Sequence, residues 1–102
     1  MNIIRLEFTS YGSLKNDKEL DEVRRRGVDI LQGNNWLTPD LIGYVLIPDG
    51  FCEIAEARGV RNDVLNYGVT TVVNKVKRND LSQGFVKYQD AIDYIQSLID
   101  KQ

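Results

Sequence analysis

The side chains that could do chemistry in this chain are one thiol, Cys52, together with fifteen carboxylates, thirteen basic residues and five tyrosines; there is no histidine. Histidine is the usual general base near neutral pH and the commonest metal ligand. Without it neither a Ser-His-Asp triad nor a Cys-His pair can form, and the common zinc sites lack their ligands. The composition therefore predicts a protein that is not an enzyme and that holds no metal and no cofactor.

The remaining groups with catalytic potential do not combine into a site. Glu53 and Glu56 stand three residues apart on a predicted strand, so they point to opposite faces. Cys52 shares its strand face with Ile54, and a free cysteine is among the most buried residue types, so we expect it in the core. Neither a G-x-x-x-x-G-K-[ST] nor a G-x-G-x-x-G phosphate-binding pattern occurs. We therefore predict no catalytic residues.

Two clusters of basic residues could contact phosphate groups. The first is Arg24, Arg25 and Arg26, and the second is Lys75, Lys77 and Arg78. Together they would form the contact surface of a nucleic-acid-binding module, which is the alternative function that the sequence allows. The net charge of −2 gives the whole chain no general attraction to nucleic acid.

Carboxylates close to the arginines favour a plainer interpretation of the first cluster. Glu22 and Arg26, and likewise Asp21 and Arg25, are four residues apart, which is a spacing for ion pairs within one helix. The lysines of the second cluster could equally protect the edge of a sheet from pairing with another chain.

Aromatic side chains supply the candidate for a protein-contact patch. Trp36, Tyr44 and Tyr67 lie outside the expected core-facing stripe of the last helix, and exposed Trp and Tyr are favoured at interfaces. The first hypothesis is therefore a small binding or regulatory domain that acts through protein–protein interaction. A homodimer is a further expectation, because an open sheet leaves edges that can pair across a two-fold axis.

The pattern of apolar residues predicts four strands and two helices in the order β-α-β-β-β-α. The expected elements are a strand at 4–8, a helix from Asn16 or Asp17 to Leu31, strands at 42–47 and 51–57 around an Asp49-Gly50 hairpin turn, a strand at 67–76, a turn at 78–80 and an amphipathic helix at 88–99. The segment 81–87 is ambiguous. This order predicts an α+β fold with an antiparallel sheet of three to four strands and both helices mainly on one face.

The size of the chain predicts one globular domain over residues 1–102. A chain of this length buries roughly two-thirds of its unfolded surface and forms a core without a disulfide or a metal. A single cysteine suits a reducing compartment, the first residues do not have the pattern of a signal peptide, and no apolar run approaches the length of a membrane span. We therefore expect a cytoplasmic protein with no membrane partner.

Overall fold

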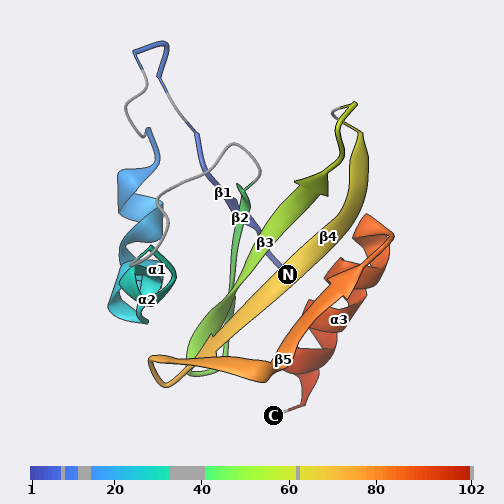
Figure 1. The fold of residues 1–102 in the computed structure, drawn as a ribbon. Coiled ribbons are helices and arrows are strands. Elements are labelled where there is room, and N and C mark those ends of the chain that lie inside the picture. Colours follow the sequence, from blue (N-terminus) through green and yellow to red (C-terminus); the bar gives the residue numbers. More distant parts are fainter. Residues whose placement is uncertain (8, 12–14, 33–40, 62, 102) are drawn as a thin grey trace.

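A computed structural model describes residues 1–7, 9–11, 15–32, 41–61 and 63–101. They form an α+β domain with a sheet between two helical layers (Figure 1). The elements in chain order are β1 (Ile4–Arg5), η1 (Asp17–Leu20, a 3₁₀ helix), α1 (Asp21–Arg25), α2 (Val28–Gln32), β2 (Leu41–Ile47), β3 (Gly50–Arg58), β4 (Val64–Val73), β5 (Val76–Phe85) and α3 (Tyr88–Asp100).

The sheet is an antiparallel meander in which every strand pairs with its neighbour in the sequence. Its order is β1-β2-β3-β4-β5, so it has five strands rather than the three to four predicted. The extra strand is β5, which contains the whole of the predicted turn at 78–80 and most of the segment 81–87 that the sequence left ambiguous. Because β1 and β5 are the edges, the central strands β2, β3 and β4 each have two strand neighbours.

The helices lie on opposite faces of the sheet, so the prediction of both helices mainly on one face is wrong. Phe51 packs with Val23 of α1 and Val28 of α2, whereas the next residue, Cys52, packs with Ile95 of α3. Successive residues of a strand point to opposite faces, so a central strand that is apolar at consecutive positions needs a cover on both sides. The result is one sheet with a separate core on each face. Figure 1 shows the helices that cover the two faces.

The predicted N-terminal helix is broken into three short pieces. Gly27 has φ 109°, a conformation that L residues rarely adopt, and it separates α1 from α2. A Cβ at this position would lie 3.0 Å from the Ile30 Cδ1 atom and 3.6 Å from the Lys75 Cα atom. The break thus lets the helical segment bend and pass close to the turn between β4 and β5.

The hairpin between β2 and β3 is confirmed, but its turn is shifted by one residue. Ile47 pairs with Gly50, so Pro48 and Asp49 form the two-residue turn, with Asp49 at φ 60°. Gly50 belongs to β3, where a Cβ would lie 1.8 Å from the carbonyl oxygen of Val72. The glycine is needed there because the neighbouring strand approaches so closely.

The turn predicted at 78–80 lies inside β5 instead. The chain reverses at Asn74 and Lys75, which have φ of 52° and 62°, the positive values that a tight two-residue hairpin turn requires. The turn contains no glycine, and it directly follows a run of β-branched residues that predicts a continuous strand. Its position therefore could not be predicted from the sequence pattern.

A bulge in β5 follows the turn. Arg78 pairs with Thr71 and Gln83 pairs with Val69, so four residues of β5, 79–82, face the single residue Thr70 of β4. The Ser82 hydroxyl accepts a hydrogen bond from the Thr71 amide (3.1 Å) and donates one to the Arg78 carbonyl (2.8 Å). These bonds replace the regular ladder and fix the shape of the bulge.

The amphipathic C-terminal helix is confirmed as α3, with Ala91 and Ile95 fully buried against the sheet. Within the described ranges of the chain, no helix has the length and apolar character needed to cross a bilayer.

Candidate functional site

The arginines of the first basic cluster are already paired with carboxylates of their own helical segment. Arg24 pairs with Asp17 and Asp21, and Arg25 pairs with Glu22 at 2.6 Å. The predicted Glu22–Arg26 pair is confirmed at 2.7 Å, while Arg25 uses Glu22 rather than Asp21. Hydrogen bonds from Arg26 and then Arg25 lower the pKa of the Glu22 carboxyl. The cluster is therefore largely neutralised before any ligand arrives.

Arg26 is a structural clamp rather than a free cation. Its Nη1 donates to the carbonyl oxygens of Ile47 (2.6 Å) and Gly50 (2.8 Å), while its Nε donates to Glu22. These bonds tie the end of α1 to both sides of the β2–β3 turn. One guanidinium thus donates a charge-assisted hydrogen bond to a carbonyl group on each side of the turn.

We expect Arg26→Met to lower the free energy of unfolding by about 2 kcal/mol, because hydrogen bonds to a charged group contribute more than neutral ones. Arg25→Met removes only an exposed ion pair and should change it by less than about 0.5 kcal/mol. Urea unfolding followed by circular dichroism measures both. Equal losses of unfolding free energy in the two variants would show that the bonds from Arg26 to the turn carbonyls stabilise the fold no more than an exposed ion pair does.

Strand geometry divides the second basic cluster between the two faces of the sheet. Lys77 pairs with Val72 on the face covered by α1 and α2, whereas Arg78 pairs with Thr71 on the face covered by α3. Arg78 is held by Asp80 through two hydrogen bonds of 2.8 and 2.6 Å. The residues of the predicted cluster therefore do not form one basic surface.

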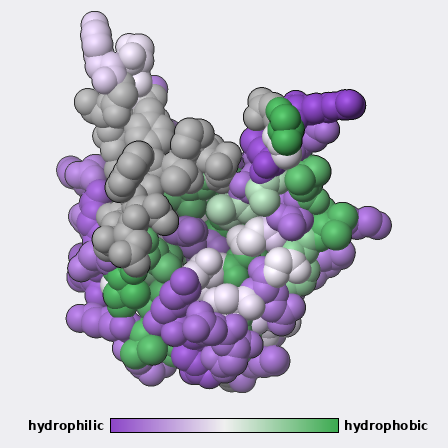
Figure 2. Space-filling view, in the orientation of Figure 1, coloured by the Kyte–Doolittle hydropathy of each residue, from purple (hydrophilic) through white to green (hydrophobic). Residues whose placement is uncertain are grey.

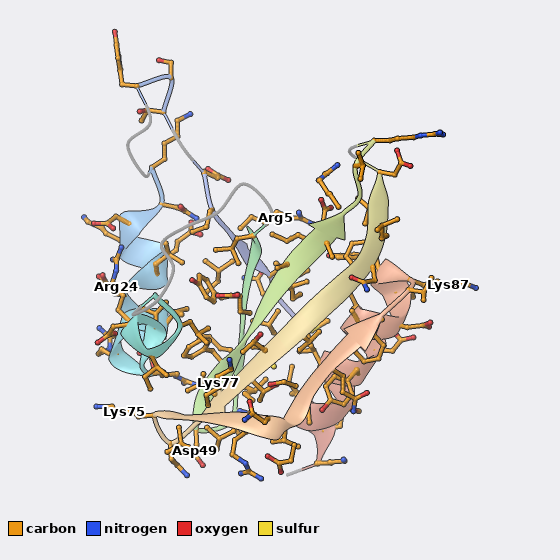
Figure 3. All side chains as sticks on the ribbon, viewed as in Figure 1. Arg5, Arg24, Asp49, Lys75, Lys77 and Lys87 are labelled. Atoms are coloured by element: carbon orange, nitrogen blue, oxygen red, sulfur yellow. The ribbon has the colours of Figure 1, made fainter. Side chains whose placement is uncertain are left out.

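Parts of the two clusters meet at one place, a polar depression of about 320 Å³ at the lower end of the sheet. Lys75 comes from the β4–β5 turn and meets Arg25 and Arg26 from the helical layer. Glu22 and Asp49 line the same depression, so its charge is mixed. Figure 3 shows Lys75 and Asp49 on neighbouring turns and Arg24 directed away from them, which leaves Arg24 outside this meeting point.

The structure does not place the predicted aromatic residues in one exposed patch. Tyr44 is 1% exposed and packs edge-on against Phe51 in the core beside α1, so it is not available to a partner. Tyr67 is half-buried, with its ring centroid 5.4 Å from that of Tyr88. Trp36 lies outside the described residues. Strand β2 is covered on both faces, so its side chains are buried or half-buried on whichever face they point to. Tyr44 points to the face covered by α1 and is therefore buried.

Cys52 lies in the core as predicted. It is fully buried, and its Sγ lies 3.5 Å from the hydroxyl oxygen of Thr71. Burial raises the pKa of the Cys52 thiol to about 11, against a smaller opposing effect of the Thr71 hydrogen bond. A thiol in this state is a poor nucleophile.

We expect the native protein to react with a thiol reagent at pH 8 at least 100-fold more slowly than the urea-unfolded chain, because burial suppresses both access and thiolate formation. The unfolded thiol ionises near pH 9 and the folded one near pH 11. The folded state therefore keeps its proton in this window, and the free energy of unfolding falls as the pH rises through it. Similar rates for the folded and unfolded chain would contradict the burial.

The other groups with catalytic potential are used in packing or ion pairs. Glu56 pairs with Arg58, while Glu53 lies on the face covered by α1 and α2, where burial raises the pKa of its carboxyl and nearby Lys77 partly offsets this. Burial likewise raises the pKa of the Tyr94 hydroxyl, which donates to the Leu81 carbonyl at 2.6 Å. In the described part of the chain no three His, Cys, Asp or Glu side chains gather as a metal site would require.

Three exposed aliphatic residues lie at the end of the hairpin formed by β3 and β4. We call Val60, Val64 and Leu65 the hairpin tip: Val60 is fully exposed, Leu65 is 60% exposed and Val64 is 36% exposed. The Gly59 amide donates to the Asp63 carbonyl at 2.9 Å, which closes the loop. Figure 2 shows apolar surface beside polar surface on this projecting end of the molecule. In the sequence, these aliphatic residues within an otherwise polar stretch are the available signal.

No family model, no curated protein and no solved structure matches this chain.

Proposed function

We propose that this protein is a non-catalytic binding domain that docks onto another protein through the hairpin tip. The observation that carries the proposal is the exposure of three aliphatic side chains at one end of the β3–β4 hairpin, Val60 in the loop and Val64 and Leu65 at the start of β4. Single exposed apolar residues are ordinary, whereas several exposed within a short stretch of one hairpin end favour an interaction surface. The proposal keeps the predicted class of partner and replaces the predicted aromatic patch as its contact surface.

The surroundings of the hairpin tip fit a protein partner. Arg58 is paired with Glu56, and Arg61 and Asp63 contribute one charge of each sign to the exposed loop. An apolar centre with a mixed polar rim is the usual arrangement of a protein interface. The Gly59–Asp63 hydrogen bond holds the loop closed, which reduces the conformational entropy that docking would otherwise remove.

Nucleic-acid binding receives less support from the same structure. Arg24, Arg25 and Arg26 have carboxylate partners, and Lys77 and Arg78 lie on opposite faces of the sheet. A gel shift at low salt that disappeared when Arg24 and Arg25 were both replaced by alanine would reverse this order of preference.

Site-specific photo-crosslinking in the cells that make this protein tests the proposal. A benzophenone amino acid at position 60 should capture a protein, whereas the same group at Asp90, an exposed position on α3, should not. The Leu65→Asp change should abolish the adduct at position 60 without changing the circular dichroism spectrum. Equal adducts at both positions, or none at position 60, would overturn the proposal. An adduct of twice the chain mass would identify the partner as a second copy.

A further inference from the structure

A small apolar cavity with basic residues at its mouth lies at the end of the sheet opposite the hairpin tip. It measures about 220 Å³, and its apolar lining is Ile47, Pro48, Val73, Leu81 and Leu98. The two other lining residues are Arg78 of β5 and Lys101, directly after α3. None of the described lining residues is a carboxylate, although Asp80 beside the lining pairs with Arg78. The cavity therefore combines an apolar interior with the positive charge of Lys101 and the part of the Arg78 guanidinium that Asp80 does not use.

The bulge of β5 forms one wall of the cavity and holds it open. The Leu81 carbonyl accepts hydrogen bonds from the Thr71 hydroxyl (2.9 Å) and from the Tyr94 hydroxyl (2.6 Å). The Arg78 carbonyl accepts a hydrogen bond from Ser82 at 2.8 Å. The backbone of both lining residues is therefore fixed from inside the protein, and the cavity does not depend on a ligand for its shape.

The guanidinium of Arg78 is held in an orientation that leaves one of its nitrogen atoms free to bind a ligand. Its Nε and Nη2 atoms donate to the two carboxylate oxygens of Asp80, which is the bidentate geometry that fixes the plane of a guanidinium. A guanidinium carries five N–H groups, and the Nη1 atom of Arg78 has no hydrogen-bond partner among the described residues. Asp80 is thus a positioning residue that leaves one end of Arg78 available to an anion.

We propose that this cavity binds the C-terminal residue of a polypeptide whose last side chain is apolar, with the terminal carboxylate held by Arg78 and Lys101. The volume has room for roughly seven water molecules at about 30 Å³ each, which is enough for one leucine or phenylalanine side chain. A terminal residue carries its side chain and its carboxylate on the same Cα atom, so it presents both chemistries to one small site. An anion beside an apolar group is the complement of this lining.

The position of the cavity beside β5 favours a polypeptide over a small free acid. β5 is an edge strand with β4 as its only strand neighbour in the described sheet. An extended chain that leaves the cavity can hydrogen-bond to the open edge, as peptides do when they add a strand to a sheet. This site is separate from the hairpin tip, so it does not rest on the proposed function.

A peptide titration of the ¹⁵N-labelled protein followed by NMR tests the proposal. The probe is an acetylated Gly-Ser-Gly-Ser-Leu peptide with a free carboxylate, and the controls are its C-terminal amide, a peptide that ends in serine, and hexanoate. The free-carboxylate peptide should shift the amide signals of Leu81, Leu98 and Lys101 in a saturable manner. The amide and the serine peptide should bind at least tenfold more weakly, since each lacks half of the recognised chemistry.

Variants test whether Arg78 and Lys101 contribute to peptide binding rather than to folding. Arg78→Met and Lys101→Ala should each weaken the free-carboxylate peptide by about tenfold, Asp80→Asn by a smaller factor, and Arg25→Met on the other face not at all. Lys101 is exposed and follows the last helix, so its replacement leaves the fold intact. Absence of shifts at the three amides, equal binding of the amide, or tighter binding of hexanoate would overturn the proposal.

Discussion

Replacing Gly50 with alanine lowers the free energy of unfolding by about 3 kcal/mol or more. An alanine Cβ would sit 1.8 Å from the carbonyl oxygen of Val72 and 3.0 Å from the Cα atom of Val73. Both atoms belong to the backbone of β4, so no side-chain rotation relieves the clash, and β3 and β4 have to separate. The Gly50 carbonyl also accepts a hydrogen bond from Arg26, so the separation disturbs the helical clamp as well.

Gly68→Ala is the matched control for this expected loss. Gly68 also lies in a central strand, but a Cβ there meets no atom within 4 Å. Alanine should leave the free energy of unfolding unchanged or raise it by about 0.5 kcal/mol, because glycine loses more backbone freedom on folding. Urea unfolding compares the two variants, and a loss at position 68 as large as at position 50 would refute the steric argument.

The second large effect is expected for Phe51→Ala, with a loss of about 4 kcal/mol. Phe51 is fully buried in the core beside α1 and α2, and its ring meets that of Tyr44 edge-on at 5.7 Å. Removing the ring leaves a cavity that a strand fixed on both sides cannot collapse to fill. In a domain of this size the melting temperature should fall by roughly 20 °C.

Phe51→Leu keeps most of the apolar volume and should lose less than about 1.5 kcal/mol. Thermal unfolding of the two variants next to the parent separates cavity formation from general sensitivity of the site. Indistinguishable melting temperatures for the alanine and leucine variants would mean that the Phe51 ring is not packed as described.

Strong periodicity made part of this fold predictable from the sequence. The apolar stripe of α3 and the hairpin between β2 and β3 both follow from local patterns. The placement of the helices did not follow, although the signal was present. Leu41–Ile47 is apolar on almost every residue, and a strand that is apolar on both sides has to be covered on both faces. A strictly one-faced sheet would have shown alternation instead.

The turns show where local patterns mislead. Asn74 and Lys75 reverse the chain with positive φ but without a glycine, whereas the polar stretch Arg78–Asp80 looks like a turn and lies in a bulged edge strand. An edge strand contacts solvent along one side, so polar residues are tolerated there. Composition alone does not distinguish such a strand from a turn.

Strand geometry also explains the positions of three candidate contact residues. Lys77 and Arg78 are neighbours in the sequence and point to opposite faces of the sheet, and Tyr44 turns into the core beside α1. Ion pairing within the helix was predictable from spacing, as Glu22 and Arg26 show. The Arg78 cavity was not, because its lining comes from four separate elements and from a bulge that no local pattern encodes.

The sequential order of the strands has a consequence for how the protein folds. Each of the three hairpins from β2 to β5 closes a short loop, so most of the sheet forms from contacts between nearby segments, which favours rapid folding. The pairing of Ile4 with Tyr44 closes the longest loop of the sheet, so the loss of chain entropy is greatest for β1. During synthesis, each strand from β2 onward finds a partner among the residues already made.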